Sequence, residues 1–169
     1  MANKDAAFGM RPIKMIGGAP YSGGQSRYRI AANYGTAIFQ GDMVAQVTGG
    51  GVEVHADAGT VPIVGVFNGC SYTDPTTGEQ VFKNYYPAST AASDIFAYVI
   101  DDPMVVFEIQ ANAAFPVADL LGNFDIVYSS TGSTKTGVLE RSCRLPTAEL
   151  EPRCPLKRLI FLKIQKIQT

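Results

Sequence analysis

The residue types that most often perform chemistry are scarce in this 169-residue sequence and follow no catalytic pattern. The single histidine, His55, has no Cys, Asp or second His at metal-ligand spacing, so we interpret it as a surface or turn residue. The carboxylates Asp101 and Asp102 adjoin Pro103, which favours a solvated turn, and no serine lies in a Gly-x-Ser-x-Gly elbow. The segment 74–78 has too few oxygen ligands nearby for calcium and predicts a β-turn. We therefore expect a protein that is not an enzyme and that uses no metal or cofactor.

The glycine-rich runs and the cysteines also favour structural roles. The glycines at 17–24 and 49–51 match neither a phosphate-binding loop nor a dinucleotide fingerprint, and we interpret them as hinges and turns. Cys70, Cys143 and Cys154 are odd in number and lack metal-type spacing. They are typical of structural thiols in a reducing cytoplasm.

Composition excludes two classes of partner. The 14 Lys+Arg and 15 Asp+Glu leave a net charge of −1, which is too balanced for a protein that neutralises nucleic-acid phosphates. The apolar runs at 61–67 and 104–107 fall far short of the roughly 20 residues of a membrane-spanning helix. The first residues do not resemble a signal peptide. We expect neither nucleic acid nor membrane as a partner.

The pattern of the chain predicts an all-β fold. Charged residues make up 17% of the chain, while the 17 Gly and 10 Pro supply many turn formers. Short β-branched and aromatic runs recur between Gly, Asn and Asp turns, as in sandwiches and barrels. The expected strands are 27–30, 37–39, 43–47, 52–54, 63–67, 81–86, 95–100, 105–109 and 124–128. We expect a compact antiparallel β-barrel or β-sandwich built as a meander, with at most one short helix, at 116–121.

Three segments differ in composition. Residues 1–24 have neither helical nor strand period and predict an extended N-terminal arm, which must cover apolar side chains on its own domain, a sister subunit or another protein. Residues 25–138 form the expected β-rich core domain. Residues 139–169 hold no glycine and carry 7 Lys+Arg and 3 Asp+Glu (net +4), against 7 and 12 (net −5) before them. The sequence does not assign a structure to this basic C-terminal tail.

Aromatic and apolar side chains are the candidate contact residues. Aromatic residues on strands are most often core, then subunit interface, then ligand-stacking residues. Consecutive tyrosines on a strand point to opposite faces, so at least one enters the core or a contact surface. The candidate contacts with a sister subunit or another protein, in the arm and among the aromatic residues, are Phe8, Met10, Arg11, Pro12, Ile13, Met15, Tyr21, Tyr85 and Tyr86.

Four segments carry a resemblance to a known family. They are 1–12 (MANKDAAFGMRP), 17–24 (GGAPYSGG), 35–44 (GTAIFQGDMV) and 63–72 (IVGVFNGCSY). Together they resemble capsid decoration, or cement, proteins of tailed bacteriophages, especially of marine and cyanobacterial phages. The resemblance extends to about residue 138.

The resemblance implies a non-enzymatic virion structural protein. Such proteins sit on the outer capsid surface, commonly as homotrimers, and lock neighbouring major capsid subunits together; before assembly they are in the host cytoplasm. The alternative is a β module on the virion that binds a glycan or host receptor. A hydrolase whose site the sequence does not reveal is a third reading. The tail departs from the family pattern, which suggests either a change of reading frame near 138–145 or a genuine basic arm or added strand at 159–162.

Overall fold

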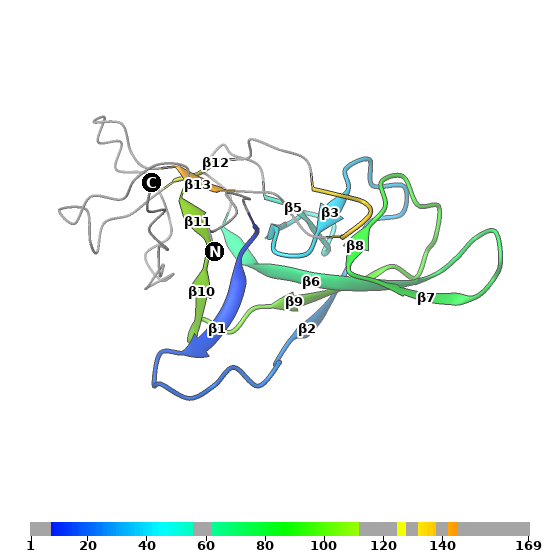
Figure 1. Cartoon of the computed structure of the whole chain (residues 1–169). Coiled ribbons are helices and arrows are strands. Elements are labelled where there is room, and N and C mark those ends of the chain that lie inside the picture. The colour runs from blue at the N-terminus through cyan, green and yellow to red at the C-terminus, as the bar shows by residue number, and fades with distance from the viewer. Residues whose placement is uncertain (1–7, 56–61, 112–124, 128–131, 138–141, 145–169) are drawn as a thin grey trace.

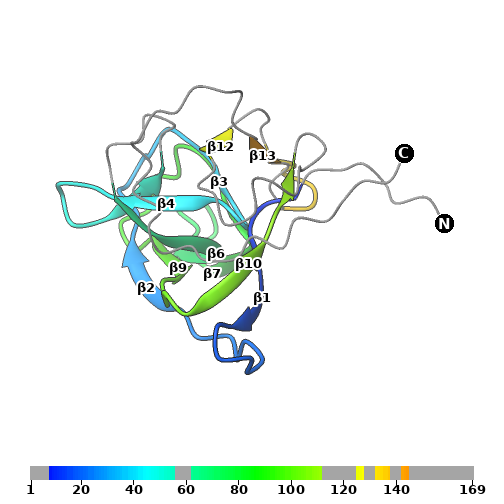
Figure 2. The same ribbon diagram turned by 90° about the vertical axis from the view of Figure 1, so that its left-hand side faces the viewer.

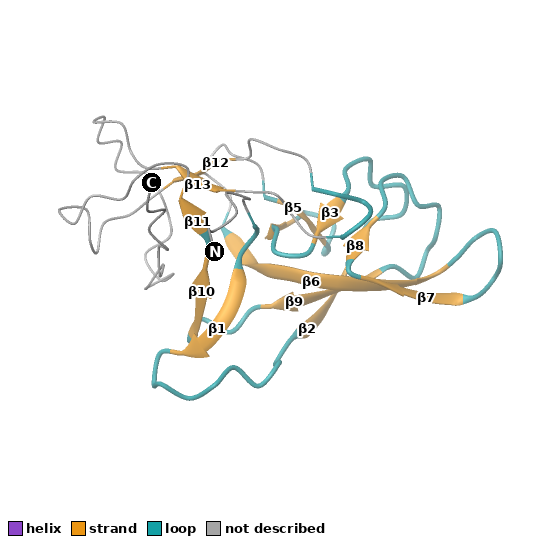
Figure 3. Cartoon of the chain, in the orientation of Figure 1, coloured by secondary structure: helices purple, strands orange, loops and turns teal. Residues whose placement is uncertain are grey.

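In the computed structural model, the described part of the chain comprises residues 8–55, 62–111, 125–127, 132–137 and 142–144. Its regular elements are all β-strands, and nearly all of the pairs are antiparallel, which confirms the all-β prediction (Figure 3). The short helix expected at 116–121 and the strand considered at 159–162 lie outside these residues. Within them, no helix has the length and hydropathy needed to cross a bilayer.

The largest sheet has six strands and runs through the middle of the molecule (Figure 1). Its order is β2 (Ser26–Arg29), β9 (Phe96–Ile100), β6 (Ile63–Thr73), β4 (Met43–Gln46) and β5 (Val52–Val54), with β7 (Gln80–Lys83) also paired to β6. Several neighbours are far apart in sequence, so the expected meander is wrong. The long strand β6 contacts β4, β7 and β9, and it organises the sheet because different parts of its length pair with different strands.

Smaller sheets flank this one. The strand β1 (Arg11–Met15) pairs with β10 (Val105–Glu108), and β3 (Ile38–Phe39) pairs with β8 (Tyr85–Tyr86). The strand β13 (Ser142–Arg144) lies between β11 (Gln110–Ala111) and β12 (Asp125–Val127), and its pairing with β11 is parallel. The layers are consistent with a β-sandwich, and the order of the main sheet ends at β2 and β5, which are not paired with each other.

Two groups of buried side chains lie on opposite faces of the main sheet. The first cluster lies between the sheet and the β3–β8 pair. Its members are Ile30, Ile38, Val44, Val52, Phe67, Cys70, Tyr72, Tyr86, Ala92, Ile95, Ala97 and Val99. The second cluster lies between one end of the sheet and the β1–β10 pair, and contains Met10, Met43, Val66, Ile100, Val105, Phe107 and Ile109. Figure 2 shows the β1–β10 pair running along the lower right side of the main sheet.

Most of the expected strands are found, with two informative differences. The expected strand 81–86 divides at Asn84 into β7 and β8, which belong to different sheets. The expected strand 63–67 continues to Thr73 as β6. A bulge between Phe67 and Gly69 accommodates the extra residue, so the chain does not leave the sheet at this glycine. The turns expected at 41–42, 49–51 and 101–103 are present.

Candidate functional site

The N-terminal segment is fixed to the body at a crossing of two glycines. An added Cβ on Gly9 would lie 2.9 Å from the Cα of Gly41, and one on Gly41 would lie 2.8 Å from the Cα of Gly9. Gly41 also has a φ of +92°, a conformation that favours glycine. The Met10 N–H donates to the Gly41 carbonyl at 3.0 Å, and the Gly41 N–H donates to the Phe67 carbonyl at 2.8 Å. The chain therefore enters the body at Gly9 with no room for a side chain.

Beyond this crossing, the arm residues form part of the body. The sequence predicts no strand here, yet Arg11–Met15 pairs with β10. The two strands are about 95 residues apart in the chain, and a local sequence pattern cannot indicate such a pairing. The register shifts between Pro12 and Lys14, which places Ile13 in a bulge. Met10 is buried, and Met15 and Tyr21 pack against the second cluster. The sequence left open whether the arm packs on its own domain, a sister subunit or another protein. The described arm residues pack on their own chain.

The other arm candidates occupy the margin of this layer. Phe8 and Pro12 are half-buried, and the exposed Arg11 guanidinium lies 4.7 Å from the centre of the Phe8 ring. The Tyr21 hydroxyl donates to the Gly24 carbonyl at 2.8 Å, which closes the glycine turn after β1. Burial, and to a lesser degree the nearby Asp102 carboxylate, raises the pKa of Tyr21, so it stays a neutral hydrogen-bond donor.

The far end of the β1–β10 layer presents an apolar pair to solvent. Ile16 is 41% exposed and Met104 is 49% exposed, and they are two of the three large hydrophobic side chains that are exposed in the described part of the chain. They are neighbours, because the Ile16 N–H donates to the Met104 carbonyl at 2.8 Å. The exposed Lys14 lies in the same strand end. This pair is the most apolar part of the arm surface that remains available to a partner.

The two consecutive tyrosines have different environments. Tyr86 is fully buried in the first cluster, and its hydroxyl donates to the Tyr34 carbonyl at 3.2 Å. Burial raises its pKa. Tyr85 is half-buried and stacks on Phe39 with ring centres 5.8 Å apart. Tyr86 is thus an internal residue, whereas the margin of Tyr85 stays accessible. Met10 is buried in the second cluster.

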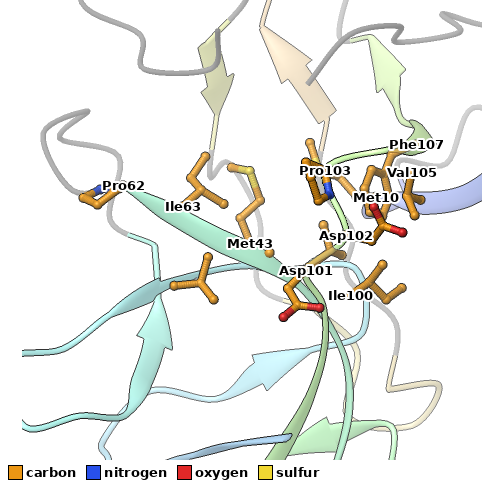
Figure 4. Close-up of a pocket in the computed structure, with 13 residues that line it drawn as sticks. Met10, Met43, Pro62, Ile63, Ile100, Asp101, Asp102, Pro103, Val105 and Phe107 are labelled. Carbon is orange, nitrogen blue, oxygen red and sulfur yellow. The ribbon is translucent and has the colours of Figure 1, made fainter. Parts of the chain in front are cut away.

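An apolar cavity of about 280 Å³ opens beside the second cluster (Figure 4). Met43 and Ile63 lie on one side of it, and Pro103, Val105 and Phe107 lie on the other. Met10, Pro62, Val64, Gly65, Val66 and Ile100 complete the lining. Two carboxylates, Asp101 and Asp102, are the charged groups among the lining residues. The cavity therefore has apolar walls and an acidic margin.

The face of the main sheet that carries β7, β6, β9 and β2 has a second distinctive surface. The register aligns Phe82, Ser71, Phe96 and Arg29 in one row across the four strands, and Tyr98 and Arg27 in the next. We call these six residues the outer face. Phe82 is 66% exposed, and the Arg27 guanidinium lies 4.3 Å from the centre of the Phe96 ring. The β1–β10 pair covers only the other end of this side of the sheet. Phe82, Arg27 and Arg29 are exposed on the outer face, Phe96 and Tyr98 are half-buried, and Ser71 between them is buried.

Polar groups that could perform chemistry are engaged in turns or buried. His55 is 7% exposed, so the expectation of a surface position is wrong. Its backbone N–H donates to the Met43 carbonyl, next to the pairing of β4 with β5. The Tyr28 hydroxyl donates to Asp101 at 2.8 Å, and Asp102 accepts from the Met104 N–H at 2.8 Å. Among the described residues, no three His, Cys, Asp or Glu side chains are grouped so that they could hold a metal.

Cys70 behaves as a structural thiol, as expected. It is free and buried, and its Sγ–H donates to the Tyr85 carbonyl at 3.3 Å. Burial raises its pKa to about 12. The thiolate, which is the reactive form, is therefore suppressed. Cys154 and the side chain of Cys143 lie outside the description.

Sequence reasoning missed the outer face and the cavity. The pattern in 81–86 predicts a strand, but it does not show which of the two faces of that strand meets solvent. Only the register with β6, which aligns Phe82 with Ser71, places that ring outside. The cavity is built from four separated segments, and no local pattern marks such a meeting.

Comparisons of the chain with family models, with curated proteins and with solved structures found no match.

Proposed function

We propose that this chain is a non-enzymatic structural protein of a tailed-bacteriophage particle. It decorates the outer surface of the icosahedral capsid as a homotrimer and cements it by bridging neighbouring major capsid subunits. It is made in the host cytoplasm and binds when the shell has expanded. Its mechanism is linkage: a protein that binds only the assembled shell shifts the equilibrium away from disassembly. Several contacts per trimer raise the effective concentration of each further contact.

One observation carries this proposal. Three of the segments that resemble decoration proteins meet at a single hydrogen-bonded junction: 1–12 contributes Gly9 and Met10, 35–44 contributes Gly41 and Asp42, and 63–72 contributes Phe67. The Phe67 N–H donates to the Asp42 carbonyl at 2.7 Å, opposite the bond from Gly41 to Phe67. The resemblance thus falls on residues that determine how the arm joins the body, which supports a shared architecture.

The surface of the arm layer suits the proposed contact. The apolar pair Ile16 and Met104 is exposed at one end of β1, and the cations Arg11 and Lys14 are exposed along it. Charged groups of both signs therefore surround the apolar pair, since Asp102 accepts from the Met104 N–H and Glu108 pairs with Arg11 in the β1–β10 register, and such a surface is suited to docking on another protein. The glycine crossing holds this surface rigid, so little entropy is lost when it binds.

Capsid binding tests the proposal directly. Purified expanded capsids that lack the protein are mixed with the full chain, and co-sedimentation gives the affinity. The double variant I16D and M104D should bind about 10-fold more weakly or worse, because it replaces the apolar contact with two charged side chains that lose hydration on binding. The control Q46A changes an exposed residue on β4 and should bind normally. A particle reconstruction should show copies over the whole shell; absence of binding by the unaltered chain would overturn the proposal.

A glycan- or receptor-binding module on the virion is the second candidate, and the outer face favours it. Phe82 and Phe96 lie in one row of the sheet surface and Tyr98 lies in the next, and the two arginines beside them can donate to hydroxyl groups. A few copies at a vertex or tail, with glycan binding that Tyr98→Ala abolishes, would favour this function over cementing.

A further inference from the structure

Phe82 is exposed in a way that its own chain does not explain. It is the most exposed of the large hydrophobic side chains in the described part of the chain, at 66%, and it lies on β7, an edge strand paired to β6 alone among described strands. In Figure 1 the β6–β7 hairpin extends away from the body at the right. Exposing a phenyl ring there forgoes burial free energy, which a partner could recover.

The cavity beside the second cluster has the size and lining to accept such a ring. A buried cavity of about 150 Å³ lined by apolar side chains is known to bind benzene in a protein core. The cavity here, at about 280 Å³, leaves room for a phenyl ring and its methylene group. Its walls, which include Met43, Ile63 and Phe107, are apolar, and thioether sulfur makes favourable contacts with aromatic rings.

The charges around the ring and around the cavity are complementary. The face that carries Phe82 also carries Arg27 and Arg29, and neither has an ion pair with another described residue. The third charged group on this side, Asp94, is engaged, because its carboxylate accepts hydrogen bonds from the Thr73 N–H and hydroxyl. The charged groups at the cavity are Asp101 and Asp102, and Asp102 is exposed. A basic face with an apolar projection therefore matches an acidic margin with an apolar hole.

The two surfaces lie at opposite ends of one strand. Ile63, the first residue of β6, lines the cavity, while the last residues of β6 pair with β7. Phe82 pairs with Ser71, and Val66, the nearest cavity-lining residue of β6, is about 17 Å from Ser71 along the strand, so a chain cannot place Phe82 in its own cavity. A second copy of the chain can, because it presents the same cavity.

We propose that Phe82 of one copy inserts into the cavity of a second copy, with Arg27 and Arg29 facing Asp101 and Asp102 across the contact. This contact uses two different surfaces, so it is heterologous and can close into a ring. This would be the subunit contact of the proposed homotrimer. The inference rests on the part of the proposed function that concerns self-association, and it does not depend on capsid binding.

Two variants of the full chain separate the two halves of the contact. F82A removes the inserted ring, and I63W fills the cavity. The control Q80A alters an exposed residue on the same strand. Mass is measured by analytical ultracentrifugation without capsids, up to about 100 μM, a range that detects dissociation constants in the micromolar range. We expect the unaltered chain and Q80A to be oligomeric, and each of the other variants to associate about 30-fold more weakly or worse.

Mixing the two variants gives the sharpest result. F82A keeps its cavity and I63W keeps its ring, so one complete contact can form between them and an equimolar mixture should give a one-to-one dimer. Circular dichroism and urea unfolding verify that both variants are folded.

The proposal is overturned if the unaltered chain is monomeric at every concentration, if F82A keeps the native mass, or if the folded variants do not combine. If the chain is monomeric and its capsid binding is lost in F82A, then Phe82 contacts the capsid and not a second copy of the chain. A correct oligomer that does not bind capsids would leave the subunit contact standing and would refute the cementing function.

Discussion

The two hydrophobic clusters are filled to different degrees. The first cluster encloses Phe67, Tyr86, Ile38 and Ile95 almost completely, each less than 2% exposed. The second cluster borders a cavity of about 280 Å³, and the arm supplies one of its walls through Met10. Close packing gives rigidity, whereas an open hole forgoes dispersion contacts. The difference separates a closely packed region from a region that borders unfilled apolar space.

Phenylalanine truncation should reveal this difference most strongly. Phe67→Ala in the first cluster should lower the free energy of unfolding by about 4 kcal/mol, because the enclosed ring leaves a new cavity. Phe107→Ala in the second cluster should cost about 2 kcal/mol, since that ring already borders empty space and has fewer neighbours to lose. Urea unfolding of both variants measures the two values. Equal losses would show that the two clusters are equally well packed.

The glycine crossing joins the arm to both regions and should give the next largest effect. Gly41→Ala adds a Cβ at 2.8 Å from the Gly9 Cα at a φ of +92°, so we expect a loss of about 3 kcal/mol from strain and displacement together. Gly18→Ala is the matched control, because Gly18 has a similar φ of +85° but nothing within 4 Å of an added Cβ. It should cost about 1 kcal/mol from the backbone conformation alone. Similar losses in the two variants would mean that the crossing does not hold the arm.

How much of this could be predicted from sequence also differs between the regions. The strands that build the first cluster were found because their β-branched and aromatic runs lie between turn residues, as at Val52–Val54. The second cluster depends on the pairing of Arg11–Met15 with Val105–Glu108, which is a contact across most of the chain. The arm's sequence has no strand period because its bulge at Ile13 interrupts the alternation.

The contact candidates follow the same division. Alternation predicts that at least one of Tyr85 and Tyr86 enters the core or a contact surface, and Tyr86 enters the core. Phe82 is four residues before Tyr86, so alternation alone would place both side chains on the same face. Phe82 faces solvent because β7 and β8 belong to different sheets, with the division at Asn84. Where exposure depends on which sheet a strand joins, sequence reasoning lacks the information.

Tyr28 connects the two regions, and its loss should have the smallest effect. Its ring packs against the first cluster, and its hydroxyl donates to Asp101 at the margin of the cavity at 2.8 Å. Tyr28→Phe removes this bond and keeps the ring, so we expect a loss of about 1 kcal/mol at neutral pH. The matched control is Tyr98→Phe, whose hydroxyl contacts the neutral Ser71 hydroxyl at 3.1 Å and should lose less.

The pH dependence distinguishes the Tyr28 bond from simple packing. The hydrogen bond to Asp101, then burial and the Asp101 charge, raise the pKa of Tyr28 above 10.0 in the folded state. The folded state therefore holds this proton more tightly than the unfolded chain does, so the stabilisation is complete below pH 10 and is lost as the pH rises through the folded value. Urea unfolding between pH 7 and about 11 should show the difference between the unaltered chain and Tyr28→Phe shrinking over that interval. A difference that stays constant with pH would mean that the hydroxyl does not link the enclosed cluster to the acidic margin of the cavity.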